Sequence, residues 1–165
     1  MKKILITLLV ALSLTGLAQD KITTFILVRH AEKDMTQSTN DPDLSAAGKE
    51  RATRLAEVLK KTDVTAIYST PFKRTRQTVE PLASNKGLAV QSYTANTDKD
   101  IDAMLAQHAG GTLVIAGHSN TIPQFANYLL NEKKFSTFED SDYGNLLVVT
   151  VLEKGKTVKV AWLSY

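Results

Sequence analysis

The sequence predicts a single α/β domain, a three-layer sandwich in which a mostly parallel central sheet lies between helices. Short apolar runs rich in β-branched residues recur along the chain, and segments with the apolar spacing of amphipathic helices separate them. Strands and helices that alternate in this way are typical of parallel sheets with helices on both faces. The length of 165 residues suits one domain, and no linker or internal repeat divides it.

The first half of the chain carries three predicted strands and two predicted helices. Residues 22–28 are β-branched and aromatic, as is typical of a buried strand. Ser45 can cap a helix, and Pro71 fits the first turn of a second helix, which Pro81 can kink. The predicted order is a strand at 22–28, a loop at 33–43, a helix from 45 to about 61, a strand at 65–68, a helix from 69–71 to 85–87 and a strand at 88–93.

The second half continues this alternation and ends in a hairpin. Gly110 and Gly111 close a helix, and the run that follows them is the most apolar strand of the chain. An acidic and aromatic segment at 131–144 is predicted to be a loop. The predicted order is a helix at 98–109, a strand at 112–116, a helix from about 121 to 130, the loop, and two strands at 146–152 and 157–163 joined around Lys154 and Gly155.

The N-terminus has the pattern of a secretory signal. Lys2 and Lys3 precede an apolar run at 4–17, which ends in small residues at 16–18. The run is shorter than the roughly 20 residues that span a bilayer, so a membrane anchor is the less favoured alternative. We expect a signal peptide at 1–18, a catalytic domain at 19–165, and a bacterial protein that is secreted or periplasmic, with no stable membrane anchor after cleavage.

Composition excludes several classes of function. Removal of the predicted signal leaves 18 basic against 17 acidic residues, so the basic pI near 9.0 gives little support to a nucleic-acid partner. The chain has no cysteine, which excludes disulfides, thiolate metal sites and a cysteine nucleophile. Its three histidines lack the paired spacing of metal ligands, so we expect neither a metal nor another cofactor.

Polar residues suited to phosphate chemistry follow three of the predicted strands. They are Arg29 and His30, the segment 69–74, and the segment 117–119. In open α/β sheets, ligands bind at the carboxyl ends of the strands, so these groups are expected to meet at one edge. A neutral imidazole is a good nucleophile near pH 7, guanidinium groups bind phosphoryl oxygens bidentately, and a second, protonated histidine would add charge. The pattern predicts phosphoryl transfer through a phosphohistidine, which needs no metal.

Four blocks of sequence, in order, resemble the histidine phosphatase superfamily, which includes the cofactor-dependent phosphoglycerate mutases. They span residues 25 to about 120, and together they are far more specific than any one of them. The resemblance implies a phosphoglycerate mutase-like α/β sandwich and a phosphatase from a small secreted bacterial branch of the family. The blocks are LVRHAE at 27–32, LSAAGKERA at 44–52, YSTPFKRTRQT at 68–78 and GHS at 117–119.

The resemblance also implies a role for each matched residue. His30 would be the nucleophile that carries the phosphoryl group. Arg29 and Arg74 would bind the phosphate, and His118 would be the second histidine of the pocket. We therefore predict a catalytic and substrate-binding site made of these four side chains.

The proton donor to the leaving group has no matching motif. Acid phosphatases of the family place an aspartate directly after the second histidine, but Ser119 occupies that position here. The segment after the third strand offers Asp98 and Asp100, and we predict Asp98 as the donor.

Three other functions remain alternatives. A phosphomutase of the same family is one, although mutases are longer and carry insertions that cover the site. A catalytically silent phosphate-binding module is another. A serine hydrolase built on Ser119 is the third, but Thr121 stands where its nucleophile elbow needs glycine. The favoured function is hydrolysis of a phosphate monoester or related phosphoryl group on a small phosphorylated substrate, and the oligomeric state stays open.

Overall fold

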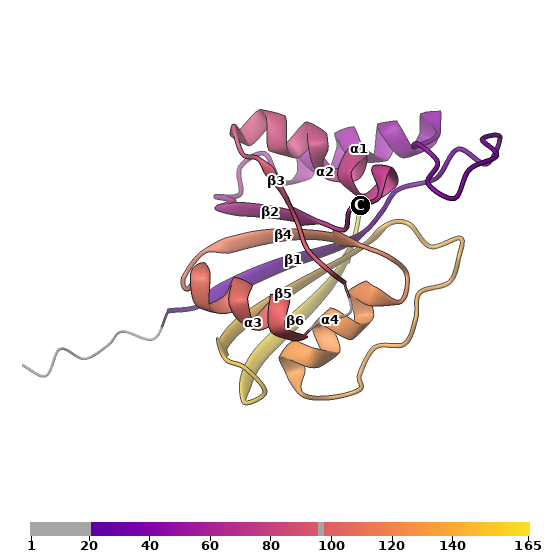
Figure 1. The fold of residues 1–165 in the computed structure, drawn as a ribbon. Helices are drawn as coiled ribbons and strands as arrows, with labels where there is room; N and C mark the ends of the chain where they lie inside the picture. Colours follow the sequence, from indigo (N-terminus) through magenta and orange to yellow (C-terminus); the bar gives the residue numbers. More distant parts are fainter. Residues whose placement is uncertain (1–20, 96–97) are drawn as a thin grey trace, which may run out of the picture.

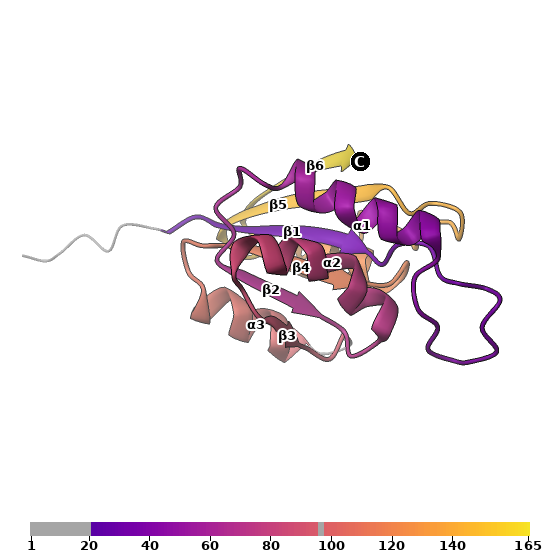
Figure 2. The same cartoon turned by 90° about the horizontal axis from the view of Figure 1, so that it is seen from above.

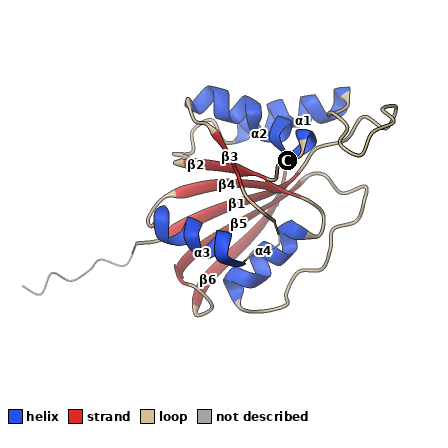
Figure 3. Cartoon of the chain, viewed as in Figure 1, coloured by secondary structure: helices blue, strands red, loops and turns tan. Residues whose placement is uncertain are grey.

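The chain folds as one central sheet with two helices on each face (Figures 1 and 3). The computed structural model describes residues 21–95 and 98–165, and the predicted signal peptide lies outside them. None of the helices in these two ranges is long and apolar enough to cross a bilayer. The elements are β1 (Thr23–Arg29), α1 (Ala46–Val58), β2 (Ala66–Ser69), α2 (Lys73–Lys86), β3 (Val90–Ser92), α3 (Asp98–Gln107), β4 (Thr112–Gly117), α4 (Thr121–Leu130), β5 (Asn145–Glu153) and β6 (Thr157–Ser164).

The sheet has the strand order β3-β2-β4-β1-β5-β6. The first four strands of this order pair in parallel, whereas β5 pairs antiparallel with β1 and β6 pairs antiparallel with β5. The predicted three-layer sandwich and the terminal hairpin are therefore confirmed. The hairpin makes the sheet mixed, because a strand that returns directly after a short turn can pair only antiparallel.

The two faces of the sheet are buried by different helix pairs. Helices α1 and α2 lie side by side over one face, and α3 and α4 cover the other (Figures 1 and 2). Successive side chains of a strand point to opposite faces. Phe25 and Leu27 of β1 therefore join the core beneath α3 and α4, while Ile26 and Val28 join the core beneath α1 and α2. Burial on both faces explains why this strand is apolar at consecutive positions.

Helix α2 begins later than the sequence predicts. The expected start at 69–71 is wrong, because residues 70–72 form a turn in front of the helix. The Thr75 hydroxyl lies within hydrogen-bond distance of the Thr70 and Phe72 carbonyls, at 3.0 and 2.8 Å, and holds this turn. Pro81 lies inside α2, and Gly87 ends the helix in the left-handed conformation, with φ of 63°. The turn at 70–72 becomes part of the site described below.

The carboxyl ends of β1, β2 and β4 meet at one edge of the sheet, on the right of Figure 1. In the parallel register, Arg29 lies opposite Gly117 and Ser69 lies opposite Ala116. The three polar segments singled out in the sequence therefore leave the sheet at the same level. The loop at 33–43 extends from this edge, and a bridge between Lys33 and Leu44 closes it.

Candidate active site

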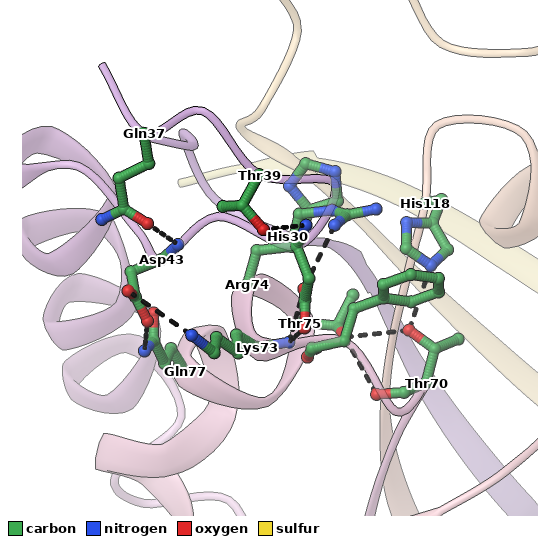
Figure 4. A network of polar contacts seen from close by, with 12 residues as sticks. His30, Gln37, Thr39, Asp43, Thr70, Lys73, Arg74, Thr75, Gln77 and His118 are labelled. Carbon is green, nitrogen blue, oxygen red and sulfur yellow. Dashed lines mark hydrogen bonds and ion pairs between the residues drawn. The ribbon is translucent and has the colours of Figure 1, made fainter. Parts of the chain in front are cut away.

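Four of the five predicted site residues gather at this edge. The rings of His30 and His118 have centroids 5.5 Å apart in an edge-on arrangement. Figure 4 shows the Arg74 side chain in the same cluster as these two imidazoles. Arg29 and His30 are each only 4% exposed. The structure thus brings two histidines and two arginines together, as the sequence predicts.

His30 is held as a neutral imidazole with one free nitrogen. Its Nδ1 lies 2.8 Å from the Ala31 carbonyl oxygen, which can only accept, so Nδ1 carries the hydrogen and Nε2 keeps its lone pair. Burial lowers the pKa of His30 to about 3 despite the Ala31 hydrogen bond, and the charges of Arg29 and Arg74 act in the same direction as burial. The ring is therefore neutral at pH 7 and able to attack an electrophile through the lone pair of Nε2.

A chain of hydroxyl groups orients His118. Thr75 donates to backbone carbonyls, so its oxygen accepts from the Thr70 hydroxyl at 2.8 Å. The Thr70 oxygen lies 3.0 Å from Nε2 of His118, and with its own hydrogen engaged it accepts the hydrogen of that nitrogen (Figure 4). This assigns the hydrogen of the neutral ring to Nε2 and leaves Nδ1 as the free nitrogen.

His118 is a neutral imidazole in the free site. Burial, followed by the charges of Arg74 and Arg29, lowers the pKa of His118 to about 4. The ring is therefore neutral in the free protein, whereas the protonated second histidine was expected in the phosphoryl-bound site. The reason is the concentration of positive charge that makes the site attractive to phosphate. A bound phosphoryl dianion would oppose this effect and favour the protonated ring.

The loop at 131–144 supplies the partners of Arg29. The Arg29 Nη1 donates to the carbonyl oxygens of Glu139, Asp142 and Asp140 at 2.8, 3.1 and 3.2 Å. The guanidinium carbon lies 4.2 Å from the Tyr143 ring centroid, which is a cation–π contact. These partners are neutral and only the exposed Asp140 carboxylate, at 3.8 Å, is charged. Arg29 thus keeps most of its positive charge available to a ligand.

Arg74 projects from the first turn of α2. Its Nη1 lies 3.4 Å from Asp41 Oδ1, and its guanidinium carbon lies 4.4 Å from the Phe72 ring centroid. Burial lowers the pKa of Arg74, and Asp41 opposes this shift. Among the described residues, the buried Nε atoms of Arg29 and Arg74 have no hydrogen-bond partner. Buried donors without partners are costly, so this pair is suited to the oxygens of an anionic ligand.

A cavity of about 440 Å³ opens beside Arg74 and His118. Within residues 21–95 and 98–165, no group of three or more histidine, aspartate or glutamate side chains could hold a metal ion. The cavity is lined by Thr70, Pro71, Phe72, Arg74, Thr94, Ala95, His118, Asn120 and Thr121.

Among the described residues, no contact joins Asp98, the predicted proton donor, to the other four side chains. It is exposed at the start of α3, and it is absent from the lining of the cavity. Asp100 accepts a hydrogen bond from the Thr94 backbone at 2.7 Å, and it is not among the residues that line the cavity. The role of Asp98 stays a prediction.

Thr70 and Phe72 contact the site but have no predicted role, and Tyr143 was expected only as part of the loop at 131–144. The first two lie inside the block at 68–78, so their position between the strand and Arg74 was the available signal. Tyr143 lies in the acidic loop, which contacts Arg29 mainly through backbone carbonyls. No side-chain pattern marks such contacts in the sequence.

Comparison with known proteins agrees with this geometry. The family model for the histidine phosphatase superfamily (branch 1) matches residues 25–101. Over 70 residues the chain is 44% identical to phosphoserine phosphatase 1 of Hydrogenobacter thermophilus, an alignment that covers 39% of this chain and 33% of that protein. The match therefore spans about a third of that curated relative.

Solved structures share the fold at low sequence identity. The protein histidine phosphatase SixA, complexed with tungstate, aligns with a TM-score of 0.70 at 14% identity, over 86% of this chain and 96% of that chain. A mycobacterial glucosyl-3-phosphoglycerate phosphatase aligns with a TM-score of 0.68 at 17% identity, over 88% and 99%. These alignments show that the chain shares the fold of the two solved phosphatases, and the family match shows that residues 25–101 are similar to the histidine phosphatase superfamily.

Proposed function

We propose that this protein is a phosphatase that hydrolyses a phosphate monoester or related phosphoryl group through a phosphohistidine on His30. One observation carries the proposal. The Nε2 of a buried, neutral imidazole is free at a place where two arginines each have a buried Nε without a partner among the described residues. A nucleophile beside preorganised positive charge is the arrangement that phosphoryl transfer requires.

The first chemical step forms a bond between His30 Nε2 and phosphorus and breaks the bond from phosphorus to the leaving oxygen. The electron pair of the broken bond stays on the leaving oxygen. Arg29 and Arg74 balance the charge on the three phosphoryl oxygens, and His118 adds a donor when the charge of the bound anion favours its protonation from solvent. The Ala31 carbonyl stabilises the imidazolium character of the phosphorylated ring through Nδ1–H.

The second step returns the enzyme to its starting state. Water attacks phosphorus, the bond to Nε2 breaks with its electron pair returning to the ring, and dihydrogen phosphate leaves with both protons of the water. No side chain is consumed. The names of the relatives support this chemistry, since the curated relative and both structural relatives described above are called phosphatases.

A screen for orthophosphate release tests the proposal. The purified protein is assayed against sugar phosphates, nucleotides, phosphoserine, phosphotyrosine and phosphohistidine, with His30→Ala as the control. We expect release from at least one substrate by the wild type and none above background by the variant. Equal release by both proteins, or none by the wild type, would refute the function.

We also propose export through a cleaved signal at 1–18, as expected for a small secreted bacterial phosphatase. The basic residues and apolar run of the N-terminus support this. Expression of the full chain in a bacterium followed by N-terminal sequencing tests it. The expected product begins at Gln19 and is found outside the cytoplasm, whereas an intact Met1 in the cytoplasmic fraction would contradict it.

A further inference from the structure

The cavity beside Arg74 and His118 is the place for the group attached to the phosphate. Two of the four phosphate-site side chains contribute to its wall, so a substrate held there extends into it directly. A second cavity, bounded mainly by the loop at 33–43, reaches only Arg74 of the four. The leaving group is therefore assigned to the first cavity.

Among the described residues, the wall of this cavity contains no carboxyl group. Its described side chains are apolar, hydroxyl or amide groups apart from Arg74 and His118. His118 uses its Nε2 hydrogen to bond Thr70. A leaving group in this cavity thus meets no carboxylic acid from the described residues of its wall.

One part of the wall is aromatic and apolar. Phe72 is 38% exposed and contributes to the wall together with Pro71 and Ala95. The Phe72 ring is fixed by its neighbours, since Arg74 lies 4.4 Å from its centroid and the His118 ring lies edge-on at 5.1 Å. A flat apolar group bound next to the phosphate would pack against this fixed ring.

We propose that the substrate is a phosphate ester of an aromatic alcohol, whose ring packs against Phe72 and whose oxygen leaves as a phenolate. The inference rests on the proposed function and adds the substrate class. A phenol has a pKa near 10, whereas an aliphatic alcohol is about as weak an acid as water, near 15.7. A phenolate therefore departs without a proton donor, and it takes its proton from solvent afterwards. An alkoxide is a much poorer leaving group, and the described wall of this cavity offers it no carboxylic acid.

The first experiment compares leaving groups. Values of kcat/KM are measured for phosphotyrosine and phenyl phosphate against phosphoserine and glycerol 3-phosphate. We expect the aryl esters to exceed the alkyl esters by roughly 10²- to 10⁴-fold, the usual contribution of a general acid that the alkyl esters lack here. Alkyl esters hydrolysed within about threefold of phosphotyrosine would overturn the inference.

Asp98→Asn completes this comparison. We expect the ratio of aryl to alkyl hydrolysis to be unchanged in this variant, because Asp98 is exposed and does not line the cavity. A selective loss of alkyl hydrolysis would show that Asp98 donates a proton, as the sequence predicts, and would overturn the inference. A wild type that hydrolyses alkyl esters well leaves the proposed function standing, whereas a wild type that hydrolyses no ester removes both.

The second experiment changes the aromatic wall. Phe72→Leu keeps an apolar side chain but removes the ring, and we expect it to raise KM for phenyl phosphate by about 2- to 10-fold. Phe72→Tyr retains the ring and should stay within about twofold of the wild type. Phe135→Leu is the matched control, because Phe135 packs against Trp162 on β6 and contributes nothing to the cavity. An unchanged KM in folded Phe72→Leu protein would overturn the role of the ring.

Discussion

The Nδ1 of His30 lies 2.8 Å from the carbonyl oxygen of Ala31, the next residue in the chain. The hydrogen of the imidazole is therefore directed by the backbone, and no carboxylate side chain is needed to select the tautomer. Because β1 and the parallel register with β4 fix this stretch of backbone, the fold itself keeps Nε2 free. The chemistry of the site follows from this relationship.

The first prediction concerns the charge of the two histidines. The pKa values of about 3 for His30 and about 4 for His118 lie below the ordinary 6.5, so both rings stay neutral from pH 5.5 to 8. Nitrogen-detected NMR of the ligand-free protein should show no titration of either ring over this range. It should also show the hydrogen of His30 on Nδ1. A midpoint near 6.5 for either ring would contradict the burial argument.

The second prediction concerns stability at low pH. Between pH 6.5 and 3 the unfolded chain binds a proton at position 30 that the folded protein does not bind, so acid lowers the free energy of unfolding. Replacement by His30→Asn removes this contribution. Urea unfolding at pH 7 and pH 4.5 should therefore show a smaller loss of stability in His30→Asn than in the wild type. Equal losses in the two proteins would contradict the depressed pKa.

The third prediction separates the two arginines. Arg29→Ala and Arg74→Ala should each lower kcat/KM by roughly 10²-fold or more, because each removes preorganised positive charge. Arg29→Ala should also lower the melting temperature, since three carbonyls of the 139–142 segment lose their donor. Steady-state kinetics and thermal unfolding check both effects. The exposed Arg54→Ala on α1 is the control and should keep full activity; a loss below threefold in either site variant contradicts the assignment.

The fourth prediction concerns the hydroxyl chain behind His118. Thr70→Val removes the acceptor of the His118 Nε2 hydrogen and should lower kcat by about 2- to 13-fold, the equivalent of one hydrogen bond. Thr70→Ser restores the hydroxyl and should recover most of this loss. NMR of the His118 ring provides a readout that a merely structural role would not change, namely a shift of the hydrogen away from Nε2. An unaltered His118 ring signal in Thr70→Val would contradict the role of the hydroxyl chain.

Much of the fold was predictable because the apolar runs are unambiguous. Strand β1 and helix α4 were predicted to within one residue, since burial on both faces or a strong apolar stripe leaves little choice of boundary. The start of α2 was not, because Pro71 suits both a helix start and the turn that precedes it. The short β3 was predicted too long at 88–93, since only residues 90–92 find a partner on β2.

The site was predictable to the extent that its residues follow strands. His30 and His118 were located correctly because the carboxyl ends of β1 and β4 adjoin. The partners of Arg29 were not, because carbonyls about 110 residues away become neighbours only through tertiary packing. The neutral state of His118 has a similar origin, since burial and two nearby guanidinium groups set its pKa and neither is local in sequence.

Trapping of the phosphorylated enzyme tests most directly whether His30 is the nucleophile. Wild type and His30→Ala are mixed with an excess of 4-nitrophenyl phosphate, quenched in alkali to preserve phosphohistidine, and digested for mass spectrometry. We expect a phosphoryl group on His30 in the wild type, and neither a phosphoryl group nor turnover in the His30→Ala variant. A label on any other residue, or turnover by His30→Ala at the wild-type rate, would contradict it.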